Sequence, residues 1–133
     1  MDWLYEGKPF EDWESWYGFV YIITHVPTGK KYIGRKYFTL AGYKQVKGKR
    51  KKIRKESDWR EYWGSSKHLQ ADIEKLGKDQ FKREIVRLCK SRTECSYYES
   101  KMILENDALL KEEYYNHWIS CKITETHIKS LKK

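Results

Sequence analysis

One carboxylate in the sequence stands where an apolar side chain is expected. Glu99 lies on the same face of a predicted helix as Cys95, Met102, Ile103 and Asn106, the face that should pack on a core. A carboxylate in such a setting is costly unless a cation, a metal ion or a hydrogen-bond donor accompanies it. Two explanations for Glu99 stay open: a metal ligand, or an ion pair with Arg or Lys at a sheet edge.

Two tyrosines are predicted to share one face of a β-hairpin. Residues 18–25 are rich in β-branched and aromatic side chains, a turn with Pro and Gly follows, and a second strand covers residues 30–34. A two-residue loop would pair Tyr21 with Gly34 and place Tyr32 diagonally on the same side. A bulge in the turn would reverse this relation. Taken singly, strand tyrosines more often pack in a core than take part in chemistry.

The positive charge of the chain is concentrated in one stretch. The net charge is +9, and residues 15–55 hold twelve Lys or Arg and no Asp or Glu, against sixteen basic and nineteen acidic residues elsewhere. Residues 44–55 are basic at eight positions of twelve, which predicts an exposed loop or ribbon. Such one-sided charge favours a polyanion, because neutralised phosphates release counterions. The simpler interpretation is a solvated loop that only aids solubility.

The elements around these residues predict one small α/β domain over residues 1–133, the size of a single compact core. We expect a three-stranded, mostly antiparallel sheet flanked by helices. The other predicted elements, read from caps, stops and periodicity, are an aromatic N-terminal arm over 1–17, a short helix over 59–63, a helix over 66–76, a strand over 81–89 and a helix from Ser91 to about Leu110.

The cysteines and the hydropathy pattern argue against two classes of protein. Cys89, Cys95 and Cys121 are odd in number and form no Cys-x-x-Cys pair, so we expect buried thiols and no disulfide framework. A zinc site that includes His117 is the alternative, although the spacing matches no standard pairing. No apolar run is long enough for a signal peptide or a spanning helix. We therefore expect no membrane partner and a cytoplasmic location, in a bacterium or a phage-infected host cell.

Taken together, these features resemble the GIY-YIG nuclease family. Residues 18–21 (Gly-Phe-Val-Tyr) and 31–34 (Lys-Tyr-Ile-Gly) resemble the paired motifs that name the family, with Phe-Val in place of an isoleucine. Residues 65–81 resemble its second helix and third strand. Glu99 falls where the family has its metal-binding glutamate, and Asn116 fits its late asparagine.

The resemblance implies an endonuclease that hydrolyses phosphodiester bonds in duplex DNA, with one Mg²⁺ ion, Mn²⁺ as a substitute, and no organic cofactor. Tyr21 would act as general base or relay, with its pKa lowered by nearby Arg and Lys charge. Tyr32 would orient the water or the phosphate. Glu99 would hold the metal ion, and Asn116 would brace the site by hydrogen bonds.

The family's catalytic arginine is harder to assign, because the basic insertion changes the spacing after the second motif. Arg60, on the predicted short helix, is expected to stabilise the phosphate charge, and Arg35 is the alternative. Either could instead be an ordinary phosphate contact or a surface charge. His68 could shuttle a proton, but a surface histidine on a helix is the simpler interpretation.

Ten cationic side chains of the basic stretch are expected to contact the nucleic-acid backbone: Arg35, Lys36, Lys44, Lys47, Lys49, Arg50, Lys51, Lys52, Arg54 and Lys55. Backbone contacts position a protein and carry no sequence information. Two other classes of function remain: a catalytically inactive nucleic-acid-binding module on the same scaffold, and a structural protein whose basic loop binds acidic partners. Homing, restriction, repair and phage DNA processing are not distinguished by the sequence.

Overall fold

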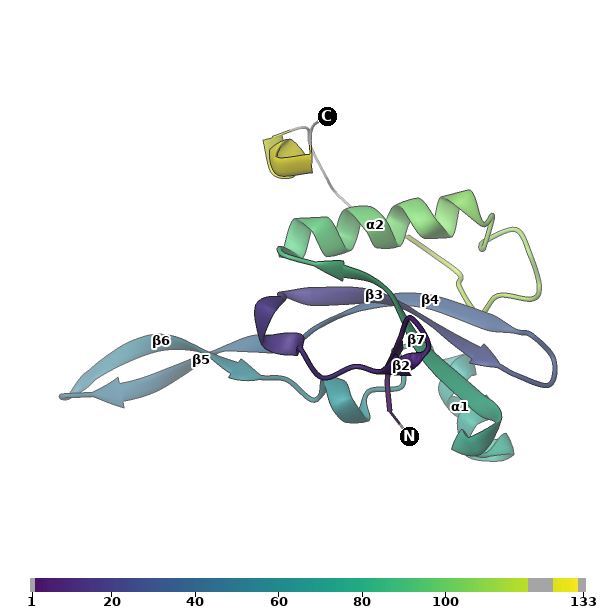
Figure 1. Cartoon of the computed structure of the whole chain (residues 1–133), viewed down its shortest axis with the longest axis horizontal. Helices are drawn as coiled ribbons and strands as arrows, with labels where there is room; N and C mark the ends of the chain where they lie inside the picture. Colours follow the sequence, from purple (N-terminus) through teal and green to yellow (C-terminus); the bar gives the residue numbers. More distant parts are fainter. Residues whose placement is uncertain (1, 120–125, 132–133) are drawn as a thin grey trace.

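Three long antiparallel strands form the centre of the fold (Figure 1). The computed structural model describes residues 2–119 and 126–131. Strand β3 (Gly18–His25) lies in the middle, between β4 (Lys31–Tyr37) and β7 (Phe81–Cys89). β3 is buried along most of its length, which suits its nearly continuous apolar sequence. These three strands are the ones that the sequence predicts.

Two short strands from the N-terminal arm enlarge the sheet to five strands, in the order β2-β1-β7-β3-β4. β1 (Leu4–Tyr5) runs parallel to β7, and β2 (Lys8–Pro9) pairs antiparallel with β1. The expected three-stranded sheet is therefore too small, because strands of two residues show no alternation that a sequence pattern could reveal. The arm packs on the core as expected: Trp3 is buried, and its indole donates a 2.6 Å hydrogen bond to the Trp59 carbonyl.

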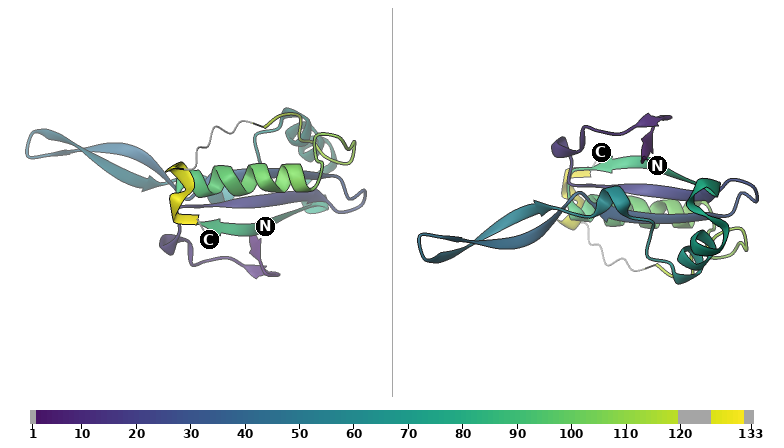
Figure 2. Two further views of the ribbon diagram at one scale, coloured as in Figure 1. Left: turned by 90° about the horizontal axis from the view of Figure 1, so that it is seen from above. Right: turned by 90° about the horizontal axis from the view of Figure 1, so that it is seen from below.

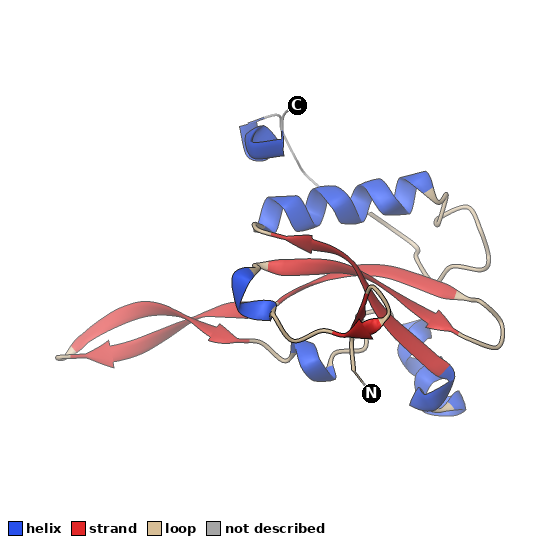
Figure 3. Cartoon of the chain, in the orientation of Figure 1, coloured by secondary structure: helices blue, strands red, loops and turns tan. Residues whose placement is uncertain are grey.

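Alternate residues of β3 face two separate hydrophobic layers. Phe19, Tyr21 and Ile23 point into a layer shared with the N-terminal arm and the first helix. Val20 points into the opposite layer, which is closed by the last long helix. This division follows from the two-residue period of a strand. Both faces of the hairpin are therefore covered, as the ribbon view also shows (Figure 3).

Helix α1 (Lys67–Leu76) begins one residue after the predicted start and ends at the predicted residue. The Ser66 side chain caps its N-terminus by accepting from the Leu69 amide, and Gly77 ends it with a φ of 95°. The short helix expected over 59–63 is a single 3₁₀ turn. The 3₁₀ segments are η1 (Trp13–Ser15), η2 (Trp59–Glu61), η3 (Lys78–Gln80) and η4 (Thr126–Leu131).

Helix α2 (Arg92–Glu105) ends about five residues before the predicted Leu110. Asp107 adopts the left-handed conformation with a φ of 51°, and the Ala108 amide donates to the Ile103 carbonyl at 3.0 Å. These features form a Schellman cap, which most often has glycine where this chain has aspartate. Without a glycine at that position, and with two leucines after it, the sequence gives no stop signal.

The basic insertion forms a two-stranded ribbon that is separate from the main sheet. β5 (Thr39–Val46) pairs antiparallel with β6 (Lys49–Glu56). Lys47 and Gly48, which connect the strands, both have positive φ, as tight hairpin turns require. The ribbon extends well beyond the body of the protein, as the views from above and below make clear (Figure 2). Of the two expected forms, loop or ribbon, the chain adopts the ribbon.

Two of the three cysteines can be compared with expectation. Cys89 and Cys95 are buried with free thiols, and Cys121 lies outside the described residues. Within residues 2–119 and 126–131, no three His, Cys, Asp or Glu side chains are grouped so as to hold a metal ion, so the zinc alternative gains no support there. None of the helices in the described part of the chain is long and apolar enough to cross a membrane.

Candidate active site

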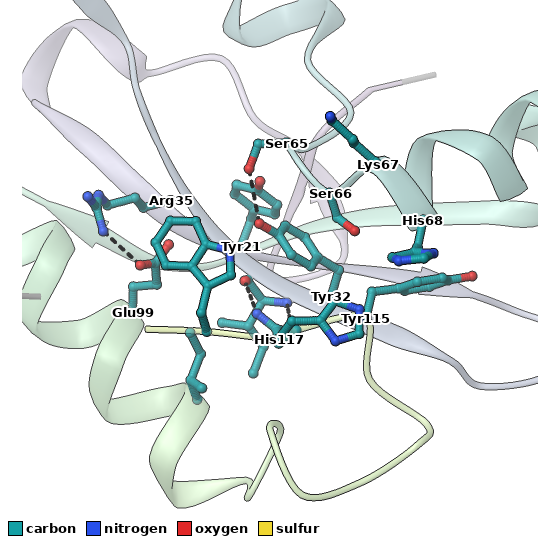
Figure 4. A pocket seen from close by; sticks show the side chains of 14 residues that line it. Tyr21, Tyr32, Arg35, Ser65, Ser66, Lys67, His68, Glu99, Tyr115 and His117 are labelled. Carbon is teal, nitrogen blue, oxygen red and sulfur yellow. Dashed lines mark hydrogen bonds and ion pairs between the residues drawn. The ribbon is translucent and has the colours of Figure 1, made fainter. Parts of the chain in front are cut away.

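A pocket with a volume of about 520 Å³ opens beside the hairpin (Figure 4). Its walls come from β3, β4, the start of α1, the middle of α2 and residues 115–118. Four of the five residues expected to be catalytic line it, namely Tyr21, Tyr32, Glu99 and Asn116. Arg35, the alternative choice of arginine, lines it as well.

The register of the hairpin brings the two tyrosines together as expected. Tyr21 pairs with Gly34, and Ile23 pairs with Tyr32. Residues 26–29 form the loop, which is longer than the expected two-residue one. The His25 amide donates to the Lys30 carbonyl at 2.8 Å, so the same residues stay opposite each other as with the shorter loop. The tyrosine ring centroids lie 6.2 Å apart, on the same side of the sheet.

The glycines of the two motifs are required by close contacts. The Tyr21 phenol lies against Gly34, where a Cβ atom would come within 2.5 Å of the phenol Cζ. A Cβ at Gly18 would come 2.7 Å from the Lys36 carbonyl oxygen and 2.9 Å from Cys95 Sγ. Glycine at both positions thus lets the tyrosine cross β4 and lets α2 approach the sheet.

Tyr21 is buried, and its ring meets that of Tyr62 edge-on, with the centroids 6.1 Å apart. Burial raises the pKa of Tyr21 well above its usual value, and the nearby Tyr62, Tyr32 and Glu99 raise it further. The expectation of a lowered pKa is therefore wrong. Burial and neighbouring acidic groups outweigh the cations that the sequence places nearby.

Tyr32 stands closer to the pocket surface than Tyr21. Its phenol is 3.1 Å from the Ser65 hydroxyl, which precedes helix α1. Burial raises the pKa of Tyr32, and the hydrogen bond with Ser65 acts in the opposite direction. This contact fixes Tyr32 between the hairpin and α1.

Glu99 and Arg35 form an ion pair on the wall of the pocket, with Nη1 and Oε1 2.7 Å apart. Their side chains are 13% and 27% exposed, so the pair is sheltered but still reaches the pocket. Burial raises the pKa of the Glu99 carboxyl, although the Arg35 guanidinium acts to lower it. The ion-pair explanation for Glu99 thus describes this structure, and the same carboxylate faces the space where a ligand would bind.

Arg60 does not reach the pocket, so the choice between the two arginines needs correction. Its Nε lies 2.9 Å from Glu56 Oε1, and its guanidinium sits over the ring of Trp59. The neighbouring Trp59 is buried in the core, and the single 3₁₀ turn therefore directs Arg60 toward solvent. Arg35 occupies the position beside Glu99 because β4 carries it directly over α2.

Asn116 is buried and bridges both backbone groups of Ile33. Its amide oxygen accepts from the Ile33 N–H at 3.0 Å, and its amide nitrogen donates to the Ile33 carbonyl at 2.8 Å. The backbone next to it pairs with the edge of β4 through Lys31 and Tyr115. The Tyr115 hydroxyl also donates to Asp72 of α1 at 2.6 Å. These contacts hold one wall of the pocket in place, as expected of Asn116.

Three pocket residues at the start of α1 were given no role from the sequence. Ser65, Ser66 and Lys67 line the pocket at the start of α1, where free backbone N–H groups and the helix dipole favour an anion. The capping signal of the helix is the feature that could have identified them. His68 lines the pocket with its ring 5.2 Å from that of His117. No sequence pattern marks Tyr62.

The expected nucleic-acid contacts fall into two groups. Arg35 and Lys36 are on β4, where the Lys36 ammonium is 2.6 Å from Asp58 and lies over the Tyr62 ring. That hydrogen bond lowers the pKa of Asp58. The other eight cations lie on the β5–β6 ribbon or in its turn. Lys36 is thus engaged by the body of the protein, and the ribbon holds the freely exposed charge.

Comparison with known families identifies the class of protein. Residues 3–119 match the family described as "Putative endonuclease segE, GIY-YIG domain". This match covers most of the chain, and the chain belongs to this GIY-YIG endonuclease family. Membership places the protein among nucleases and implies a nucleic-acid substrate. No curated protein and no solved structure matches the chain.

Proposed function

We propose that the protein is a divalent-metal-dependent endonuclease that hydrolyses phosphodiester bonds in duplex DNA. The observation that supports this proposal most is that one pocket is lined by four side chains suited to the reaction: Glu99, Arg35, Tyr21 and Tyr32. The chain also belongs to a nuclease family. Phosphodiester hydrolysis needs an activated water, neutralised phosphate charge and help for the leaving oxygen. A carboxylate, a guanidinium and phenols are the side chains suited to these tasks.

Glu99 is the residue that would hold the metal ion. Its carboxylate is sheltered at the pocket wall, and a partly buried carboxylate with a raised pKa gains from a cation beside it. The described residues contain no cluster of three ligating side chains, so the ion would keep most of its water shell. Mg²⁺ suits such a one-carboxylate site, and Mn²⁺ is the natural substitute. When bound, the ion would neutralise phosphate charge and assist the leaving 3′ oxygen.

Arg35 is the residue that would contact the scissile phosphate. One guanidinium nitrogen is engaged by Glu99, and a guanidinium has five N–H donors in a rigid plane. The remaining donors can pair with phosphate oxygens while the ion pair keeps the group in position. The Arg35 guanidinium and a metal ion held by Glu99 would thus neutralise the phosphate from adjacent positions.

Tyr21 would act as a protonated hydrogen-bond donor and not as a phenolate. Its raised pKa keeps the phenol protonated at neutral pH, so it donates a hydrogen bond toward the reacting oxygen atoms. Tyr32, held by Ser65, would orient the attacking water or the phosphate.

Cleavage of supercoiled plasmid in Mg²⁺ tests this proposal. Glu99→Gln removes the carboxylate charge with little change in shape, and we expect it to abolish nicking and linearisation. Glu105→Gln is the matched control, because Glu105 is an exposed carboxylate on the same helix that forms an ion pair with Lys101. A chelator should stop wild-type cleavage, and added Mn²⁺ should restore it.

Two outcomes would contradict the proposal. Cleavage that survives both the chelator and Glu99→Gln would remove the metal and its ligand from the mechanism. Binding without cleavage in Mg²⁺ and in Mn²⁺, on plasmids of varied sequence, would favour a catalytically inactive binding module instead.

A further inference from the structure

One face of the β5–β6 ribbon carries planar hydrogen-bonding side chains. Cross-strand pairing places Gln45 opposite Arg50 and Tyr43 opposite Lys52, and these four residues define the arginine face. The Arg50 guanidinium stacks on the Tyr43 ring, with Cζ 3.8 Å from the ring centroid. Stacking limits the freedom of the guanidinium but leaves its in-plane N–H donors available. The arginine face thus presents an oriented guanidinium beside an amide.

The opposite face of the ribbon carries ammonium groups and aliphatic side chains. Lys44 is opposite Lys51, and Val46 is opposite Lys49, with Lys55 on the same side nearer the body. These residues define the lysine face. An ammonium group is a point charge that suits phosphate but cannot make the two-pronged contact of a guanidinium. Both faces are therefore cationic, with more positive charge on the lysine face, and they differ in recognition chemistry.

The ribbon is anchored at its base and free along its length. At the base, Arg54 donates to the Thr39 carbonyl at 2.8 Å and lies over the Tyr17 ring. The Ser57 amide donates to the Phe38 carbonyl at 2.8 Å and closes the ribbon where it leaves the main sheet. Each strand has eight residues, which gives a reach of roughly 26 Å. The ribbon is thus long enough to follow a duplex for most of one helical turn.

We infer that the ribbon inserts into the major groove of duplex DNA, with the arginine face toward the base edges and the lysine face supplying phosphate contacts. A two-stranded ribbon fits the major groove of B-form DNA, whereas the major groove of an RNA duplex is too deep and narrow. Arg and Gln make the bidentate contacts that distinguish guanine and adenine. The inference rests on the proposed function and adds a sequence-reading element outside the pocket.

Binding measured without cleavage tests this inference separately from the proposed function. The Glu99→Gln protein in chelator is titrated with a DNA duplex about three helical turns long, with each of its single strands, and with an RNA duplex of the same sequence. We expect the DNA duplex to bind at least tenfold more tightly than the other probes. A ribbon shortened by replacing residues 40–55 with a Gly-Asn turn, which retains Thr39 and Glu56, should lose this preference.

Adjacent residues on opposite faces provide a matched pair of variants. Arg50→Ala and Lys51→Ala each remove one exposed cation from β6. Lys51→Ala should lower the slope of log affinity against log salt by about one and leave sequence preference unchanged. Sequence preference is measured by letting the protein select duplexes from a randomised pool. Arg50→Ala and Gln45→Ala, the second of which changes no charge, should each weaken the preference for one base at one base pair by roughly tenfold.

The inference is overturned if the shortened ribbon binds as tightly as wild type, or if single strands or the RNA duplex bind equally well. It is also overturned if Arg50→Ala and Lys51→Ala change affinity and sequence preference alike, which would make the ribbon a general phosphate contact. Cleavage plays no part in these measurements. A protein that passes them and never cuts DNA would contradict the proposed function alone.

Discussion

The pocket and the ribbon are built on different physical principles. In the pocket, Tyr21 is buried, Gly34 has no room for a side chain, and Glu99 is paired with Arg35. Along the ribbon nearly every side chain is exposed and the strands pair only with each other. Close packing ties each pocket residue to several others, whereas ribbon side chains contribute singly through charge and hydrogen bonds. Substitutions should therefore have large, coupled effects in the pocket and small, additive effects on the ribbon.

Gly34 in β4 and Gly42 in β5 give the largest expected contrast. Gly34→Ala forces a Cβ into the Tyr21 phenol, and we expect a loss of about 3 kcal/mol in the free energy of unfolding together with loss of cleavage. Gly42→Ala, on the ribbon, places its Cβ 3.4 Å from the flexible Lys55 side chain and should change stability by less than about 0.5 kcal/mol. Chemical denaturation of both variants makes the comparison. Equal losses of stability in the two variants would show that the pocket and the ribbon do not differ in how closely they are packed.

Tyr21→Phe isolates the hydroxyl from the ring. The ring contacts with Trp3 and Phe19 remain, so we expect folding to be retained while the cleavage rate falls about a hundredfold. Tyr97→Phe, at a half-buried position on α2 that does not line the pocket, is the control and should cut at the wild-type rate. Single-turnover cleavage at saturating enzyme measures the rate. A Tyr21→Phe protein that cuts as fast as Tyr97→Phe would assign Tyr21 to packing alone.

Asn116→Ala tests the brace on β4. The change leaves the buried N–H and C=O of Ile33 without their side-chain partners, and we expect the free energy of unfolding to fall by about 2 kcal/mol. Asn106→Ala removes one amide hydrogen bond at the end of α2 and should cost about 0.5–1 kcal/mol. Thermal or urea unfolding of the two variants provides the test. An Asn116 variant as stable as the Asn106 variant would show that other groups hold this wall.

The pH dependence of stability should give the smallest effect. Burial raises the pKa of Glu99 in the folded protein, so the folded state holds this proton more tightly than the unfolded state. The contribution of Glu99 is therefore present below the ordinary glutamate pKa and is lost as pH rises through the raised value. As pH rises from the ordinary glutamate pKa to the raised pKa of Glu99, the unfolding free energy of wild type should fall relative to that of Glu99→Gln. A shift in favour of wild type would mean that the Arg35 pair dominates.

Much of the scaffold was predictable because its signals are local. The alternation in residues 18–25, the Ser66 cap and the Gly77 stop predict β3 and α1 with little error. The hairpin tyrosines were correctly paired because a longer loop kept the same parity. The end of α2 was missed because its cap uses Asp107 instead of glycine, and strands β1 and β2 were missed because they are too short to show a period.

The sequence by itself determined the hairpin, the family motifs, the concentration of charge and the oddity of Glu99, because each is a property of residue order along a strand or helix. Only the tertiary structure decided that Arg35, and not Arg60, lies beside Glu99, and that the pKa of Tyr21 is raised and not lowered. Both outcomes depend on which elements pack together. Burial and the distance between charges arise from that packing and cannot be read from spacing along the chain.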